Sequence, residues 1–372
     1  MFDFFSFFIY FSLLFSLIIL TQNGARVKVV KNYEFMLSDN RLSLGSLIGL
    51  LLLSFISGFR KNVGVDWKGY SEIFFDIGKG QNEYRLEEGF YFLNKIIHDF
   101  GGSATIMFFV VAFISWYFIF RSVSDLILPW FIYFLFVNEY FFWSMNGVRQ
   151  FISIGIFLFS IKFIITREKF KYFIFIFVAI LFHKSSAILL IFYFLPYDKL
   201  FNRSIWIILF ILSFILGYFS LFKIFIVDFV QVLLQYITIF SNYNSFFENE
   251  QFVASDLNLG FGFYFQLITS FIIILLSNKF IIKYPESKIY FVLFMISAII
   301  FNLFYMFSPI GRINIFLLII KCILLSIISS HYWETKKHQV LILLLLFFYF
   351  IIFSSAIYNS SNMCSPYNLI FN

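Results

Sequence analysis

Long runs of apolar residues, separated by short polar stretches, constrain the fold of this chain more than any other feature. A helix needs about 20 mostly apolar residues to cross a bilayer. Runs close to that length occupy residues 4–20, 42–59, 103–120, 126–145, 150–165, 204–222, 259–277, 289–307, 312–330 and 339–357. The pattern predicts an all-α polytopic integral membrane protein in which residues 1–372 form a single membrane domain.

The composition indicates that lipid is the solvent for much of the chain. The 372 residues are 61% hydrophobic and 13% charged, whereas soluble domains carry roughly 25% charged residues. The formal net charge is +7, but the cations are dispersed between the apolar runs and form no known binding motif. This distribution argues against a nucleic-acid partner.

Residues 172–195 determine the topology. The polar residues 183–186 interrupt this stretch, which could form one span or the two short limbs of a hairpin, 172–182 and 185–196. Each limb would be roughly 16–18 Å long at 1.5 Å per residue, which is less than the ~30 Å hydrocarbon core. In a hairpin, His183 would lie below the outer surface, where irregular backbone must be buried in protein or line a wet cavity.

The distribution of Lys and Arg favours the hairpin, because cytoplasmic loops are enriched in both residues. With a hairpin, Lys223 and Arg312 lie outside, and the later loops place on the cytoplasmic side Lys199, Arg203, Lys279, Lys283, Lys288, Lys336 and Lys337. A single span would invert this distribution. We therefore expect about 12 transmembrane segments, including a short broken-helix hairpin, with both termini outside.

Two longer loops, 60–102 and 223–258, lie on the outer side in this topology. Both contain apolar stripes at helical spacing, which predict interfacial helices. The stripes are Trp67, Tyr70, Phe74 and Ile77; Phe90, Leu93, Ile97 and Phe100; and Phe225, Ile226, Phe229, Leu233, Tyr236, Ile237 and Phe240.

Three helix starts on the outer side carry cations. Arg149 and Arg312 each follow a glycine-containing turn, and Lys184 begins the descending limb of the hairpin beside His183. Helix N-termini present unpaired N–H groups and partial positive charge, and the arginine fork can bind phosphate oxygens bidentately. Together with Gln150, these residues predict a phosphate cradle. Alternatively, each arginine anchors the chain to lipid headgroups.

The sequence lacks the common signatures of nucleotide and metal enzymes. It contains no H-E-x-x-H, G-x-x-x-x-G-K-[ST], G-x-S-x-G or G-x-G-x-x-G motif, and no D-x-D in a loop. A nucleotide-dependent cytoplasmic enzyme is therefore not expected, and no cofactor or metal is predicted.

Short motifs in a set order resemble those of EpsG-type, Wzy-like O-antigen or exopolysaccharide polymerases. They extend from about residue 58 to 320 and are Arg60-x-x-x-Gly64-x-Asp66-x-x-x-Tyr70, Glu87-x-Gly89-Phe90, Arg149-Gln150, Phe182-His183-x-Ser185 and Gly311-Arg312. The chain departs from the pattern at Val65, where a small polar residue is common, and at Glu88, where proline is common.

The resemblance implies a membrane glycosyltransferase of the bacterial cytoplasmic (inner) membrane, for which a GT-C-like fold is one candidate architecture. Such enzymes join oligosaccharide repeat units carried on undecaprenyl pyrophosphate, at the periplasmic or outer face. The growing chain moves from its lipid pyrophosphate to the non-reducing end of a fresh lipid-linked unit. The donor and acceptor are thus both lipid-linked oligosaccharides, and a flippase and a chain-length regulator are expected partners.

The resemblance also assigns roles to residues. Cations would stabilise the negative charge that develops on the leaving pyrophosphate, and the base for the acceptor hydroxyl could be Asp66, Glu87 or His183. The candidate catalytic residues are Arg149, Arg312, His183, Asp66 and Glu87, and the candidate substrate-binding residues are Arg60, Gln150, Lys184, Tyr70, Tyr243 and Asn244. A ligase that uses the same donor, and a lipid-linked oligosaccharide flippase or other transporter, remain alternatives.

Overall fold

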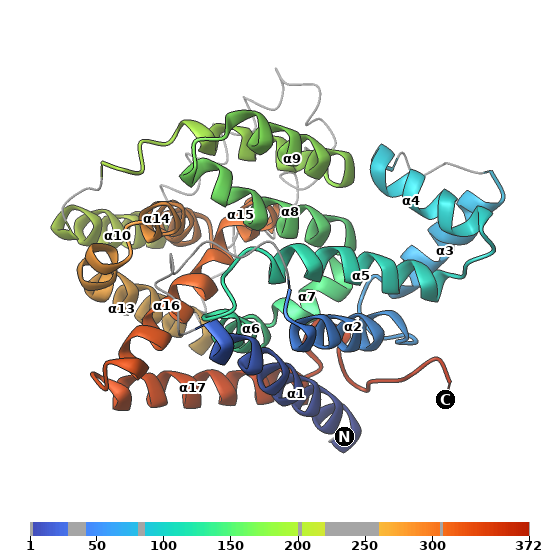
Figure 1. Cartoon of the computed structure of the whole chain (residues 1–372), viewed down its shortest axis with the longest axis horizontal. Helices are drawn as coiled ribbons and strands as arrows, with labels where there is room; N and C mark the ends of the chain where they lie inside the picture. The colour runs from blue at the N-terminus through green and yellow to red at the C-terminus, as the bar shows by residue number, and fades with distance from the viewer. Residues whose placement is uncertain are drawn as a thin grey trace. The chain divides into compact units, whose positions relative to one another are not determined.

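The chain folds into helices throughout the part that the structure describes. The computed structural model describes residues 3–28, 42–80, 86–199, 203–219, 260–305 and 308–371, which contain fifteen α-helices and two 3₁₀-helices (Figure 1). The chain forms two compact units. Unit 1 comprises Met1–Leu195 and Leu325–Asn372, and unit 2 comprises Pro196–Leu324.

Most helices belong to unit 1. They are α1 (Phe4–Lys28), α2 (Leu44–Gly58), α3 (Trp67–Gly78), α4 (Glu88–Asp99), α5 (Ala104–Phe120), α6 (Leu128–Val137), α7 (Tyr140–Asn146), α8 (Val148–Ile165), α9 (Lys169–Phe182), η1 (Lys184–Phe194), α17 (Gln339–Tyr358) and η4 (Ser361–Met363). Within unit 1, α1 packs on α2, α2 on α5, α5 on α8 and α8 on α9.

Unit 2 contains α10 (Arg203–Tyr218), α13 (Phe261–Lys283), α14 (Ser287–Phe304) and α15 (Ser308–Leu318), and the boundary between the units falls within α16 (Ile320–Glu334). Buried amides and hydroxyls connect these helices. The Asn302 side chain donates to the Phe210 carbonyl (3.2 Å) and to Ser213 Oγ (3.0 Å), which joins α14 to α10.

The predicted apolar runs are mainly helical in the residues that the structure describes. Six apolar helical stretches of the described residues are long enough to cross a membrane: Phe4–Gln22, Val148–Ile165, Phe261–Lys283, Ser287–Phe304, Ile310–Glu334 and Gln339–Tyr358. Leu44–Gly58, Ala104–Phe120, Leu128–Val137, Lys184–Phe194 and Arg203–Tyr218 are shorter apolar helices. The architecture is that of a polytopic α-helical membrane protein, and the total of about 12 segments stays a prediction.

One run that we predicted to be a single span is divided, and a second contains a turn of one residue. Residues 126–145 form α6 and α7, which are separated at Asn138 and Glu139. Glu139 has the left-handed φ of 62°, a conformation that few residues other than glycine adopt and that cannot continue a helix. Residues 312–330 lie within the apolar stretch Ile310–Glu334, in which a turn at Ile319 separates α15 from α16.

The predicted hairpin at 172–195 is confirmed. The Tyr172 hydroxyl of α9 donates to the Leu189 carbonyl of η1 (2.6 Å), and the Tyr193 hydroxyl donates to the Arg167 carbonyl (3.2 Å). The end of η1 therefore returns to the start of α9, and His183, in an extended conformation (φ −156°, ψ 108°), lies at the turn. The descending limb is a 3₁₀-helix, which rises about 2.0 Å per residue.

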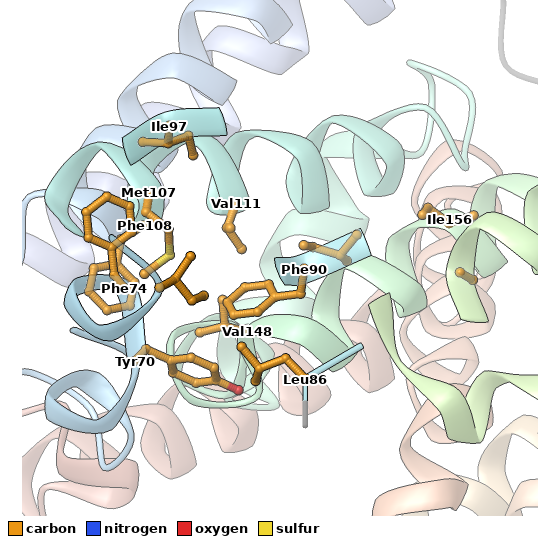
Figure 2. Close-up of a cluster of buried hydrophobic side chains, with 13 residues drawn as sticks. Tyr70, Phe74, Leu86, Phe90, Ile97, Met107, Phe108, Val111, Val148 and Ile156 are labelled. Atoms are coloured by element: carbon orange, nitrogen blue, oxygen red, sulfur yellow. The ribbon is translucent and has the colours of Figure 1, made fainter. Parts of the chain in front are cut away.

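Helices α3 and α4 form as predicted in the loop 60–102, and their apolar faces pack on α5 and α8. A cluster of buried side chains joins the four helices (Figure 2): Tyr70, Phe74, Ile77, Leu86, Phe90, Ile97, Met107, Phe108, Val111, Val148, Ile152 and Ile156, with Ala179 of α9. The prediction for Phe100 was wrong, since its side chain is 88% exposed. Because α4 ends at Asp99, Phe100 no longer lies on the helical face. The predicted helix in 223–258 lies outside the described residues.

The two ends of the chain lie next to each other. The Tyr10 hydroxyl donates to the Cys364 carbonyl (2.5 Å), and the Tyr367 amide donates to Ser6 Oγ (2.6 Å). The Lys61 amide also donates to the carbonyl of residue 368 (2.9 Å). The loop that follows α2 therefore lies on the same side of unit 1 as both ends of the chain.

Candidate functional site

Arg149 lies in the first turn of α8, directly after the break at Gly147 that separates this helix from α7. Its Nη1 donates to the Glu87 carboxylate, and its Nε donates to the Tyr70 hydroxyl (3.4 Å). The guanidinium carbon is 5.9 Å from the centroid of the Tyr70 ring and 6.0 Å from that of Phe90, within range of cation–π attraction. The side chain is 30% exposed, so it can meet a ligand.

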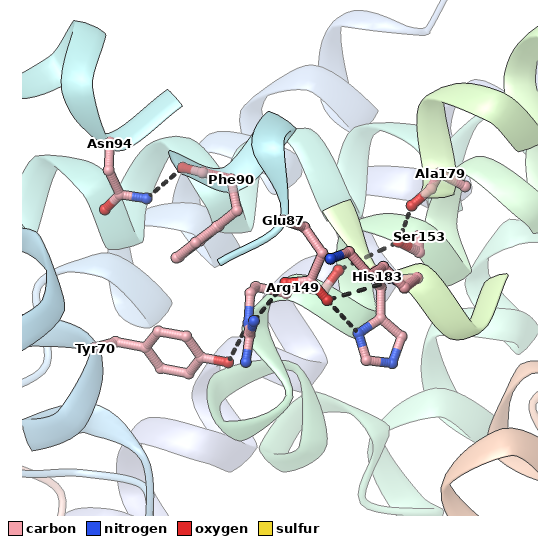
Figure 3. Close-up of polar contacts among 9 residues, drawn as sticks. Tyr70, Glu87, Phe90, Asn94, Arg149, Ser153, Ala179 and His183 are labelled. Atoms are coloured by element: carbon pink, nitrogen blue, oxygen red, sulfur yellow. Dashed lines mark hydrogen bonds and ion pairs between the residues drawn. The ribbon is translucent and has the colours of Figure 1, made fainter. Parts of the chain in front are cut away.

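Glu87 connects Arg149 to the turn of the hairpin (Figure 3). One carboxylate oxygen, Oε2, pairs with Arg149. The other, Oε1, lies 3.6 Å from His183 Nδ1 and accepts from the Lys184 amide (3.5 Å). The Glu87 side chain is 10% exposed and that of His183 is 27% exposed. A nearly buried carboxylate thus holds two partly exposed groups, one on each oxygen.

The motif Glu87-x-Gly89-Phe90 explains how the carboxylate reaches this position. A Cβ on Gly89 would lie 2.8 Å from the Leu181 carbonyl oxygen, so only glycine lets the start of α4 approach the end of α9 so closely. Phe90 is fully buried in the cluster of α3, α4, α5 and α8. Gly89 and Phe90 therefore fix Glu87, which precedes the first turn of α4.

The position of His183 is fixed from the opposite side by α8. The Ser153 hydroxyl donates to the Ala179 carbonyl (2.8 Å), and the His183 amide donates to the same carbonyl (2.9 Å). Ser153 lies one helical turn after Arg149. The same two turns of α8 therefore position the arginine and the histidine.

The charges around Glu87 determine its ionisation. Burial raises the pKa of this carboxyl, but the contact with His183 and the positive charge of Arg149 outweigh burial and lower the pKa to about 2. Burial also raises the pKa of Tyr70, which the neighbouring guanidinium partly opposes. Glu87 is therefore ionised at neutral pH, and a group with so low a pKa is a weak base there.

Arg60 is buried and donates hydrogen bonds to main-chain carbonyls. Its side chain is 2% exposed. It donates to the carbonyls of Val63 (3.0 Å), Met145 (2.7 Å) and Ser57, and stacks over the Phe108 ring at 4.6 Å. These contacts join the end of α2 to the end of α7. The structure therefore places this predicted substrate-binding cation inside the protein.

Three other predicted site residues of unit 1, Gln150, Lys184 and Asp66, differ in their burial and in their contacts with the Arg149 site. Gln150 is buried, and Lys184 contributes its main-chain amide to Glu87 while its side chain is exposed. Asp66 is exposed at the start of α3, one turn before Tyr70. The structure thus brings together Arg149, Glu87, His183 and Tyr70.

Arg312 and the loop candidates are placed elsewhere. Arg312 is exposed in the first turns of α15, in unit 2. Its predicted convergence with Arg149 stays a prediction. Tyr243 and Asn244 lie outside the described residues.

Asn146 is a site residue to which the sequence analysis gave no role. Its Oδ1 accepts from the Asp66 amide (3.5 Å), and its Nδ2 donates to the carbonyls of Phe142 (3.3 Å) and Asn362 (3.2 Å). Gly64, with φ 96°, passes so close that a Cβ there would lie 2.7 Å from Asn146 Oδ1. The glycine of the motif Gly64-x-Asp66 is thus required by both conformation and space. The available signal in the sequence was the pair Asn146-Gly147, which follows one apolar run and precedes the next.

The described part of the chain also contains a cavity away from this site. It has a volume of about 470 Å³ and is lined by Ile18, Gln22, Leu126, Pro129, Trp130, Tyr133, Ser330, Trp333, Glu334 and Leu346. Gln22 lies roughly 24 Å along α1 from Ser6, and Ser6 contacts the C-terminal segment. The cavity therefore belongs to the opposite end of unit 1. Among the described residues, no group of three or more His, Cys, Asp or Glu side chains is placed to share a metal ion.

Comparison with known proteins bears out the resemblance seen in the sequence. The model of the EpsG family matches residues 46–369. The match includes α2, the Glu87, Arg149 and His183 motifs, Gly311-Arg312 and the C-terminal segment. Neither the curated proteins nor the solved structures contain a match to the chain.

Proposed function

Because the chain belongs to the EpsG family, membrane proteins linked to exopolysaccharide biosynthesis, we propose that it is a polysaccharide polymerase. In this proposal it joins oligosaccharide repeat units carried on undecaprenyl pyrophosphate, at the outer face of the bacterial cytoplasmic membrane. The observation that carries the proposal is the cluster at the start of α8 in which the Glu87 carboxylate pairs with Arg149 and faces His183 Nδ1 at 3.6 Å.

The leaving group explains why the site needs a fixed cation. When the C1–O bond of the donor sugar breaks, its electron pair stays on the pyrophosphate oxygen, so negative charge develops there. Arg149 is held by Glu87 and Tyr70 before any ligand binds, and a preorganised cation stabilises developing charge without rearrangement. The main-chain N–H groups at the start of α8 add partial positive charge on the same side.

The acceptor hydroxyl must lose a proton as its oxygen bonds to C1. His183 is suited to accept it, because Glu87 faces Nδ1 at 3.6 Å and leaves Nε2 as the acceptor nitrogen. This pairing of a carboxylate with one imidazole nitrogen sets the tautomer and the ring orientation, as in a hydrolase triad. In this proposal Glu87 is a positioning residue, while Arg149 and His183 touch the substrates.

The substrate partners follow from the same proposal. The donor and the acceptor are both undecaprenyl-pyrophosphate-linked oligosaccharides. A flippase acts before the polymerase, and a chain-length regulator acts together with it. Arg312, exposed at the start of α15, is the candidate for a second contact with pyrophosphate.

Substitution of Arg149 in the native host tests the proposal. We expect Arg149→Ala to abolish polymer and leave single repeat units on the carrier, while the protein still inserts into the membrane. Lys68→Ala removes an exposed cation of α3 whose ion pair with Glu72 spans 3.9 Å, and it should leave polymer length unchanged. A normal polymer ladder in the Arg149→Ala strain would refute the proposal. Loss of every transferred unit, including the first, would indicate a ligase instead.

A further inference from the structure

Helix α7 is held at both ends by the segment that follows α17 (red in Figure 1). We call residues 360–370 the C-terminal strap. At the start of α7, the Glu139 carboxylate accepts from Ser361 Oγ and from Asn362 Nδ2 (3.5 Å). At its last residue, Asn146 Nδ2 donates to the Asn362 carbonyl (3.2 Å). Two turns of helix are thus clamped by consecutive residues of a segment more than 200 positions away.

The strap itself is fixed to the rest of unit 1. The amide of Gly64 donates to the Met363 carbonyl (2.9 Å), and the amide of Ile370 donates to the Phe59 carbonyl (2.9 Å). Arg60 and Leu369 form an isolated antiparallel bridge. Tyr367 is buried, and its hydroxyl donates to the carbonyl of residue 56 (2.7 Å). The strap is therefore anchored along its whole length, and it can hold α7 in place.

The backbone at the points of contact has unusual conformations. Glu139, Ser360, Asn362 and Met363 all have positive φ, between 52° and 62°, in the left-handed region that residues other than glycine seldom adopt. Such conformations persist only where surrounding contacts impose them. The contacts between the strap and α7 are therefore part of what keeps the break between α6 and α7 in its shape.

This clamp bears directly on the site, because Arg149 lies three residues after Asn146. The side-chain oxygen of Asn146, Oδ1, also accepts from the Asp66 main-chain N–H (3.5 Å), so a single side chain joins the strap, the start of α3 and the break before α8. We propose that Glu139 and Asn146 are positioning residues of the polymerase site, and that they act through α7, with the strap as their anchor. The expected effect on catalysis rests on the proposed function. The contacts between the strap and α7 can be tested independently of that function.

The experiment uses a reporter on α7 in full-length protein purified into nanodiscs. Ser144 is half-buried, and its hydroxyl donates only to the nearby Phe141 carbonyl, so Ser144→Cys leaves the clamp intact. The rate of labelling by a maleimide, corrected with protein that lacks Ser144→Cys, reports how firmly α7 is held. Polymerase kcat and KM are measured on the corresponding variants that lack Ser144→Cys.

We expect Glu139→Ala and Asn146→Ala to label several-fold faster and to lower kcat roughly tenfold or more, with a smaller change in KM. Glu139→Gln should restore both properties, because its amide oxygen can still accept from Ser361. Asn359→Ala is the control, since that side chain is exposed and donates to Ser355 Oγ (3.1 Å), outside the contacts with α7. If Glu139→Ala does not fold, Ser361→Ala, which removes one donor to the same carboxylate, carries the test.

Two results would overturn the inference. Unchanged labelling in Glu139→Ala and Asn146→Ala would mean that the strap does not hold α7. Glu139→Gln as inactive as Glu139→Ala, with normal labelling, would mean that the Glu139 charge acts on the substrate itself. If Arg149→Ala instead retains polymer, the proposed function fails, while the labelling still decides whether the clamp exists.

Discussion

Replacing Glu87 with Gln removes the negative charge between Arg149 and His183 and keeps the size of the side chain. The carboxylate is 10% exposed, and its pKa is lowered from the ordinary 4.5 to about 2. That difference corresponds to roughly 3 kcal/mol in favour of the charged form. Because Arg149 is 30% exposed, water screens part of the attraction, and we expect a loss of about 1–3 kcal/mol in the variant.

The expected consequence is a melting temperature a few degrees lower. In the proposed reaction the same contacts would orient Arg149 and His183, so we also expect a kcat about 10–100-fold lower. Both are measured on purified protein in nanodiscs, by thermal unfolding and by polymer formation from lipid-linked repeat units. Glu88→Gln is the matched control, since Glu88 is the neighbouring acid and is exposed. The reasoning is wrong if the two variants behave alike, or if Glu87→Gln retains full activity.

Three further predictions follow from the same contacts. Gly89→Ala should lower both the melting temperature and the activity, because its Cβ would lie 2.8 Å from the Leu181 carbonyl oxygen. Gly69→Ala is the control and should be neutral, since a Cβ there meets nothing within 4 Å. Equal effects of the two substitutions would contradict the account. Arg60→Met should reduce the amount of folded protein, because it leaves buried carbonyls without donors; normal yield with loss of polymer alone would point to substrate binding instead. The stabilising contribution of the Glu87 carboxylate should be complete above about pH 4.5 and disappear as the pH falls toward its pKa of about 2. Between these pH values, the melting temperature of Glu87→Gln should therefore change less with pH than the melting temperature of the parent protein.

The helical architecture was predictable, because apolar runs of membrane-spanning length leave few alternatives. The hairpin at 172–195 was predictable from charge, since only a reversal there keeps Lys and Arg on one side. The break at Glu139 was missed, because a single acid in an apolar run gives no sign of the distant Ser361 and Asn362 that bind it. Tertiary contacts, and not local pattern, end α6.

The sequence named the residues that meet at the candidate site among its candidates, but it did not indicate their arrangement. The motifs named Arg149, Glu87 and His183, yet nothing in their spacing indicates that one carboxylate bridges the other two. Asp66, Glu87 and His183 were equal candidates for the base, and only the contacts with Arg149 and His183 show why the carboxyl of Glu87 stays ionised. Arg60, an arginine in the same motif, proved to be buried and bound to carbonyls, which no sequence pattern distinguishes from an exposed cation.

The most direct test of the central claim is the affinity of the purified protein for undecaprenyl pyrophosphate in nanodiscs. If Arg149 holds the leaving pyrophosphate, Arg149→Ala should bind it about 10–100-fold more weakly, as expected for loss of a charged hydrogen bond. Binding of undecaprenyl phosphate, which has one phosphate fewer, should change less. Equal affinity of the parent and Arg149→Ala for undecaprenyl pyrophosphate would contradict the account.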